Sequence, residues 1–234
     1  MQVRGRRRCA DCGEKWSYYD TGSVTCPVCG SIHSVSADGD RQFHTDAPVD
    51  LDLVDARADV GQRPLREVAA DVEEITLEYV SARGFVHAGE LQPLDETVVA
   101  ASHLRYVAAH LRRSIRTPTE DVEAHFLALL SGAPDGEQPD TVPEPLWGPY
   151  GLALTDVVDR YRSETVDWLG DCGRPAAPAL ERLRDHVKRI EALEGEVSPA
   201  ESRALLCATR EVGTYLREDD EAALARATER LDGL

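Results

Sequence analysis

Four cysteines near the N-terminus have the type and spacing of a metal-binding unit. They lie in the stretch CADCGEKWSYYDTGSVTCPVCG as Cys9, Cys12, Cys26 and Cys29, with the spacing C-x2-C-x13-C-x2-C. Thiolates bind Zn²⁺ tetrahedrally, and each Cys-x-x-Cys turn supplies two of them. Gly13 and Gly30 follow the two pairs and allow the positive φ that such turns need. The pattern predicts one structural Zn²⁺ whose four protein ligands leave no open position for catalysis.

Three other uses of the cysteines fit the sequence less well. Disulfides are uncommon in the reducing compartment that we expect for this chain. Resemblance to a rubredoxin-type iron site extends to the Cys-x-x-Cys-Gly turns but implies a much longer spacer than the one found here. A redox dithiol needs only one Cys-x-x-Cys pair. Zinc is therefore the predicted metal, and its binding energy is expected to fold a segment too small to fold alone.

The segment between the two cysteine pairs is predicted to be a β-hairpin. We expect one strand over 16–19, a turn at DTGS and a second strand at 24–25, followed by a third short strand at 32–35. Together with the cysteines, these elements make up a zinc ribbon over residues 1–36.

Basic and aromatic residues accompany the cysteines. The candidate contact residues are Arg4, Arg6, Arg7, Arg8, Lys15, Trp16, Tyr18 and Tyr19. Residues 1–37 carry five basic and three acidic side chains, a net charge of +2, so the rest of the chain carries −19. Arginine suits phosphate and aromatic rings stack on bases, which favours contact with nucleic acid. Contact with a protein partner stays open. So does a structural role, in which the rings pack the ribbon and the arginines form a solvated tail.

The composition of the whole chain indicates its solvent more than its partner. The 234 residues carry a net charge of −17, and only Lys15 and Lys188 of the 26 basic residues are lysines. This composition resembles that of proteins from salt-in halophilic archaea, where carboxylates keep surfaces hydrated and molar salt screens their repulsion. The sequence has no apolar run long enough to cross a membrane and no apolar signal region at its N-terminus. We therefore expect a cytoplasmic protein without membrane contact.

The cysteine unit resembles the zinc ribbons of archaeal transcription factor B and of RNA polymerase subunits. The resemblance covers about 30 of the 234 residues, and it implies that the four cysteines are metal ligands. The whole chain, a ribbon followed by an acidic helical body, resembles an uncharacterised halophilic archaeal family of zinc-ribbon-containing proteins of the transcription-factor-B type. The body does not match the cyclin-like repeats of transcription factor B, so a role as an initiation factor is not implied.

The remainder of the chain is predicted to be helical, which makes the fold class mainly α. Residues 37–63 are rich in aspartate without a sustained period, and we expect an acidic linker or an extended strap. Residues 64–234 are predicted to be an acidic all-α domain, a bundle of about seven helices. The expected helices lie at about 64–82, 95–115, 117–131, 154–168, 180–190, 198–216 and 219–231.

Local signals refine this plan. Capping boxes with proline at the first helical position are predicted at 117–120 and 198–201. Five prolines between 132 and 150 predict a long loop or a subdomain joint, pinned to the body by Trp147 and Tyr150. The similar stretches GELQP and GEVSP each precede a helix and suggest a duplicated three-helix unit at 64–131 and 178–232. The alternative is that amphipathic helices simply look alike.

Few residues of the body suggest chemistry. His103 and His110 are two helical turns apart, too far to share one ion, and are expected to flank the core. Cys172 and Cys207 are expected to be buried thiols. We therefore expect a non-enzymatic binding protein that contacts nucleic acid, or the transcription or translation machinery, through its ribbon. The alternative is an enzyme with a site in the helical body and a purely structural zinc ribbon.

Overall fold

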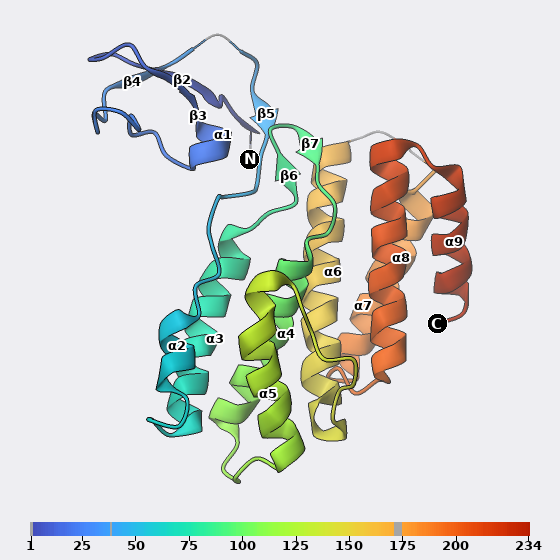
Figure 1. Cartoon of the computed structure of the whole chain (residues 1–234). Coiled ribbons are helices and arrows are strands. Elements are labelled where there is room, and N and C mark those ends of the chain that lie inside the picture. Colours follow the sequence, from blue (N-terminus) through green and yellow to red (C-terminus); the bar gives the residue numbers. More distant parts are fainter. Residues whose placement is uncertain (1, 38, 171–174) are drawn as a thin grey trace.

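The computed structural model describes residues 2–37, 39–170 and 175–234, and it confirms a mainly α fold with a small N-terminal β region (Figure 1). The β region contains β1 (Gln2–Val3), β2 (Arg6–Cys9), β3 (Lys15–Ser17), α1 (Tyr18–Thr21) and β4 (Ser34–Ser36). The connecting segment contains β5 (Gln42–Phe43) and α2 (Val54–Asp59). The body contains α3 (Leu65–Ala82), β6 (Val86–His87), β7 (Glu90–Leu91), α4 (Glu96–Arg113), α5 (Glu120–Gly132), α6 (Trp147–Leu169), α7 (Ala177–Ala192), α8 (Pro199–Glu218) and α9 (Glu221–Asp232).

The helix α4 is the centre of the body. It packs against α3, α5 and α6, and α6 in turn packs against α7 and α8. Most of its circumference is buried, from Val98 through Leu104 to Leu111. Outer helices bury one stripe only, as Leu180, Leu183 and Val187 do on α7. The apolar periods of the sequence thus predict both the helices and the faces that they bury.

The segment between ribbon and body is a strap whose second half belongs to the core. Leu51, Leu53 and Ala56 are buried in the main apolar cluster. The guanidinium of Arg57 donates from Nε to the carbonyl of Leu130, at 2.9 Å. Residues of this segment therefore contribute to the apolar core of the body.

The N-cap predicted at Ser198 is confirmed and the one predicted at Thr117 is wrong. Ser198 Oγ accepts from the backbone amide of Glu201 at 3.2 Å, as predicted. The helix expected from Thr117 begins instead at Glu120, with Thr119 as its N-cap residue. This start places three carboxylates in the first turn of α5, where the helix dipole favours negative charge.

The proline-rich segment is shorter than predicted, because α6 begins inside it. Two 3₁₀ turns, Ala133–Asp135 and Glu144–Leu146, precede Trp147, the first residue of α6. Pro149 lies in the first turn of the helix, where a missing amide hydrogen costs nothing. The predicted anchors do hold the segment, since Tyr150 is buried and Trp147 Nε1 donates to the carbonyl of Val142 at 3.1 Å.

The first turns of α6 pass very close to the turn before α8. A Cβ atom on Gly195 would lie 2.1 Å from the carbonyl oxygen of Gly148, and one on Gly151 would lie 2.2 Å from that of Gly195. Gly195 also has a φ of +80°. Only glycine therefore fits at this crossing.

The two halves of the predicted duplication pair their helices differently. In the first unit, α3 packs along α4. In the second unit, α8 packs mainly along α9 and on α6, whereas α7 packs mainly on α6. This difference argues against a repeated three-helix unit.

Candidate metal centre

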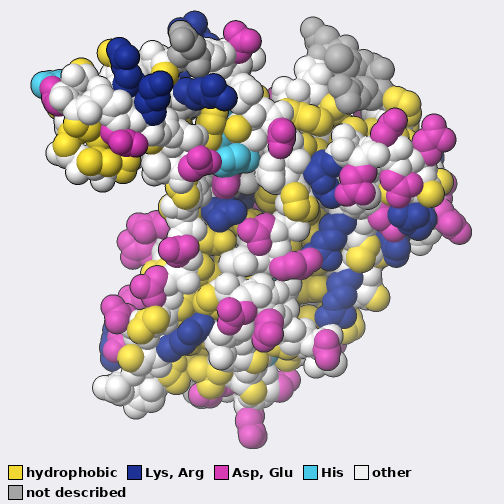
Figure 2. Space-filling view, turned by 45° about the horizontal axis from the view of Figure 1, so that its top comes forward, with side chains coloured by type: hydrophobic (Ala, Val, Ile, Leu, Met, Phe, Trp, Pro, Cys, Tyr) yellow, Lys and Arg dark blue, Asp and Glu magenta, His cyan; other side chains and the backbone are white. Residues whose placement is uncertain are grey.

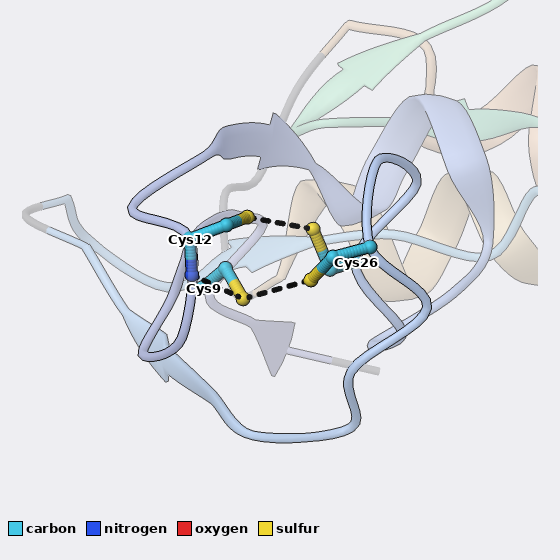
Figure 3. A group of neighbouring side chains, drawn as sticks. Cys9, Cys12 and Cys26 are labelled. Atoms are coloured by element: carbon cyan, nitrogen blue, oxygen red, sulfur yellow. Dashed lines mark hydrogen bonds between the residues drawn. The ribbon is translucent and has the colours of Figure 1, made fainter.

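The four cysteine sulfurs lie together at the end of the ribbon. All four Sγ atoms lie within 4.8 Å of one another. The separations Cys9–Cys29 and Cys12–Cys26 are both 3.6 Å, and Figure 3 shows the sulfurs converging from two facing turns. A tetrahedron with Zn–S bonds of about 2.3 Å has edges of about 3.8 Å, whereas a disulfide needs about 2.05 Å. The four cysteines therefore could hold a metal ion such as zinc.

Two similar turns present the sulfurs. In the first, the amide of Gly13 donates to the carbonyl of Cys9 at 3.2 Å, and in the second the amide of Gly30 donates to that of Cys26 at 2.9 Å. Both glycines have a positive φ, as the sequence predicts. The first cysteine of each pair is buried and the second is exposed.

The electrostatics of the cluster suit a cation. The backbone amide of Cys12 donates toward the Sγ atom of Cys9 at 3.5 Å, and this hydrogen bond lowers the pKa of Cys9 to about 6. The backbone hydrogen bond from Glu14 lowers the pKa of Cys12, but the neighbouring cysteines and burial outweigh it and raise that pKa to about 12. Thiols this close cannot all ionise by themselves, and a bound divalent cation removes that conflict.

The ribbon sheet differs from the predicted hairpin. Its strand order is β3-β2-β4, so the arginine run is the central strand. The predicted strand at 24–25 is absent from the described structure, and residues 18–21 form a short helix. The third strand lies at 34–36, two residues later than expected at its start. The arginine run is therefore not a solvated tail, because it pairs on both of its edges.

Three of the basic side chains share one face of this sheet. Arg8 is paired with Lys15 on one side and Val35 on the other, and Arg6 is paired with Ser17. Directly paired residues on neighbouring strands point to the same face of a sheet, and so do residues two positions apart on one strand. Arg6, Arg8 and Lys15 therefore form one surface, which we call the basic face. All three are exposed, and none forms an ion pair within residues 2–37, 39–170 or 175–234. Figure 2 shows Lys and Arg side chains gathered on the ribbon.

The other two arginines lie elsewhere. Arg7 points to the opposite face, where its Nε atom donates to Ser34 Oγ at 3.0 Å. Arg4 precedes β2 and is exposed. The structure therefore brings together three of the five basic residues that the sequence singles out.

The aromatic residues are engaged within the protein. Trp16 Nε1 donates to the carbonyl of Ser23 at 3.0 Å. Tyr19 is buried, its hydroxyl donates to the carbonyl of Val3 at 2.7 Å, and its ring lies 4.8 Å from that of His44. Tyr18 contacts the same histidine edge-on at 6.3 Å. The rings of Tyr18 and Tyr19 therefore hold the ribbon against the connecting segment, and the ring of Tyr19 also lies 6.3 Å from that of His87 in β6 of the body.

Apolar side chains at the second cysteine turn were not anticipated from the sequence. Val28 is 69% exposed and Ile32 is 72% exposed. The position of Val28 between Cys26 and Cys29 was the available signal, because a residue at the tip of so tight a turn has no core to enter.

A buried histidine pair in the body was not anticipated from the sequence. His103 is buried and His110 is half-buried on α4, consistent with their expected place at the core, but His103 also meets a histidine of α5. Its Nε2 atom is 3.3 Å from Nε2 of His125, and its Nδ1 atom is 2.9 Å from Oε1 of Gln138. Residues three positions apart lie on the same face of a helix. The spacing of His125 from the apolar Val122 was therefore the signal that His125 is buried.

The His103 pair predicts a pH dependence of stability. Burial, with a smaller contribution from His125, lowers the pKa of His103 to about 3. The unfolded chain therefore takes up a proton near pH 6.5 that the folded chain refuses until about pH 3. The contribution of His103 to stability is therefore full above pH 6.5 and falls by about 1.4 kcal/mol per pH unit below it, down to about pH 3. Urea unfolding between pH 7.5 and 5 measures this slope. His103→Asn should have a shallower slope than His110→Asn, and equal slopes would contradict the assignment.

The remaining cysteines are not part of the metal cluster. Cys207 is half-buried in the body, and Cys172 lies outside the described residues. Among the described residues, no helix combines the length and apolarity that a membrane crossing requires.

Comparison with known proteins gives a family and no function. Neither a curated protein nor a solved structure shows significant similarity to the chain. A family model matches residues 1–231. The chain therefore belongs, along almost its whole length, to the family of unknown function DUF7117.

Proposed function

We propose that this protein is a zinc-binding, non-enzymatic binding protein whose ribbon contacts nucleic acid. The observation that carries the proposal is the basic face, where Arg6, Arg8 and Lys15 are exposed side by side without ion pairs in the described parts of the chain. A single Zn²⁺ held by four cysteines would have a structural role, because it would have no open position for a substrate.

Arginines outside the ribbon differ from those of the basic face, because many of them are paired with carboxylates. Arg63 lies 2.7 Å from Asp59 and 2.6 Å from Asp71, and Arg210 lies 2.6 Å from Glu96. Many body arginines are neutralised in this way by their own chain. In a protein with a net charge of −17, uncompensated cations on one small sheet favour an external polyanion.

The packing of the aromatic rings within the protein indicates how the ribbon would contact nucleic acid. Tyr19 is buried and Trp16 is half-buried with its Nε1 atom bonded to Ser23, so neither ring is a fully exposed platform for stacking on bases. The basic face suits phosphate groups, which position a protein on nucleic acid without reading its sequence. Because the composition favours a protein of the halophilic archaeal type, with a ribbon of the transcription-factor-B type, binding assays should extend to molar potassium chloride.

A protein of the transcription or translation machinery is a second candidate partner. The exposed Val28 and Ile32 favour it, because a pair of uncovered apolar side chains suits a protein surface better than a phosphate backbone. Affinity purification at high potassium, with and without nuclease, separates the two candidates. Loss of all partners after nuclease treatment supports nucleic acid, and a partner that survives it supports a protein contact.

Neutralising the basic face should weaken nucleic-acid binding and its salt dependence together. For Arg6→Gln/Arg8→Gln/Lys15→Gln, the slope of log K against log salt should fall by about 2.7 if each side chain contacts one phosphate of a duplex. Fluorescence anisotropy with a labelled duplex at several potassium chloride concentrations measures it. Arg113→Gln/Arg116→Gln/Arg184→Gln is the matched control, since it removes the same charge from exposed body positions. Identical slopes for the two triple variants would contradict the proposal.

A further inference from the structure

A cavity in the helical body has the chemistry of an anion site. Its volume is about 400 Å³, and it lies between the N-terminus of α4, the proline-rich segment, the start of α6 and the middle of α8. Its lining residues are Glu96, Gln138, Pro139, Asp140, Tyr150, Arg203, Leu206, Cys207 and Arg210. We propose that this cavity binds a small oxyanion, a molecule that carries a carboxylate or a phosphate group. The proposal is independent of the ribbon.

Arg203 is a cation without a counter-ion. Its Nε atom donates to the hydroxyl of Tyr150 at 3.1 Å, and its Nη2 atom donates to the backbone carbonyl of Asp140 at 2.7 Å. Both acceptors are neutral, and no carboxylate pairs with Arg203 within the described parts of the chain. A guanidinium has five N–H donors, so these two bonds hold it in place and leave three donors for a ligand. A fixed guanidinium of this kind recognises a carboxylate or phosphate through two parallel hydrogen bonds.

Tyr150 supplies a further donor. Its oxygen already accepts from Arg203, and no acceptor for its hydroxyl hydrogen is found among the described residues. Burial raises the pKa of Tyr150, although Arg203 opposes the shift. The hydroxyl therefore keeps its hydrogen at neutral pH and can donate it to a ligand.

Arg210 completes the polar wall. It lies seven residues after Arg203, two turns or about 10.5 Å further along the same side of α8. Its Nη2 atom pairs with Glu96 at 2.6 Å, which neutralises the carboxylate that α4 contributes. Its Nε atom is buried and has no hydrogen-bond partner in the described structure. The second carboxylate of the lining, that of Asp140, belongs to an exposed residue.

Apart from the exposed carboxylate of Asp140, the unmatched polar groups of the cavity are donors, which predicts a ligand rich in acceptors. The apolar part of the wall, Leu206 with Pro139, suits a small organic skeleton attached to the anionic group. Cys207 lies in the same wall, so a bound ligand should cover its thiol and thereby report on occupancy.

Alkylation of Cys207 tests the proposal on the full-length zinc-loaded protein. Iodoacetamide labelling of the Cys207 peptide is followed by mass spectrometry with inorganic phosphate, with succinate, or with potassium chloride of equal ionic strength. At about ten times Kd, the bound anion should slow labelling about tenfold. Protection by one anion alone assigns the class as phosphate or carboxylate. Equal labelling in all three salts overturns the proposal.

Variants separate binding from a general salt effect. Arg203→Gln and Tyr150→Phe should each abolish the protection while their urea transitions stay cooperative. Arg57→Gln is the matched control, since Arg57, like Arg203, donates two hydrogen bonds to neutral acceptors of the protein, here two backbone carbonyls, but lies outside the cavity. If Arg203→Gln does not fold, Tyr150→Phe decides, because it removes only one hydroxyl. Protection that persists in the folded variants would overturn the assignment to this cavity.

Discussion

Cys26→Ser should release the zinc and unfold the ribbon while the helical body stays folded. Cys26 is buried at the centre of the cysteine cluster, and the ribbon has little else to hold it. Within residues 2–36, the only large apolar side chain that is buried besides the cysteines is that of Tyr19. Structural Zn²⁺ contributes about 10–16 kcal/mol of apparent binding free energy in small domains, so a three-ligand site should lose most of the ribbon's stability.

Two measurements check this expectation. Zinc content by elemental analysis should fall from about one equivalent to near zero. Amide hydrogen exchange should show loss of protection in β2, β3 and β4, with α3 to α9 still protected. Cys207→Ser is the control, because it removes a thiol outside the cluster. Full zinc content in Cys26→Ser, or a body that unfolds with the ribbon, would contradict the prediction.

Gly195→Ala should be among the most destabilising single substitutions in the body. The φ of +80° costs an alanine about 1–2 kcal/mol. The new Cβ would also lie 2.1 Å from the carbonyl oxygen of Gly148, and overpacking of this kind adds about 1–3 kcal/mol. The sum, about 2–5 kcal/mol, is a large part of the stability of a typical domain.

The matched control separates the two causes. Gly61 has a φ of +77°, and a Cβ there would have no atom within 4 Å. Gly61→Ala should therefore cost only the conformational part, about 1–2 kcal/mol. Urea unfolding with an unchanged m-value measures both variants. Equal costs would show that α6 can move away from the turn before α8.

The cysteine turns and the helices of the body could be predicted because their signals lie within short stretches of sequence. The two Cys-x-x-Cys-Gly turns specify their own backbone, so the positive φ of Gly13 and Gly30 could be predicted without a fold. The helices of the body could be predicted because their apolar residues recur with the helical period. Even there, α6 begins earlier than predicted, because Pro149 lies in the first turn of the helix, where proline is tolerated.

The failures come from features that depend on a partner far away in sequence. A run of arginines carries no apolar alternation, so nothing local indicates that Arg7 pairs with both Trp16 and Ser36. The contact between His103 and His125 joins two helices, and the cavity beside Arg203 joins three helices and a loop. Such sites become visible only when the packing of the helices is known.

The central position of β2 has a consequence for the surface that the ribbon displays. Consecutive residues of a strand face opposite ways, so a slip of one position would turn Arg7 outward and hide Arg6 and Arg8. In most sheets a buried apolar side prevents such a slip, but here Cys9, the last residue of β2, is a member of the metal cluster. A bound ion would thus fix the register of β2. By anchoring the sulfur of Cys9, it would determine which arginines are exposed on the basic face.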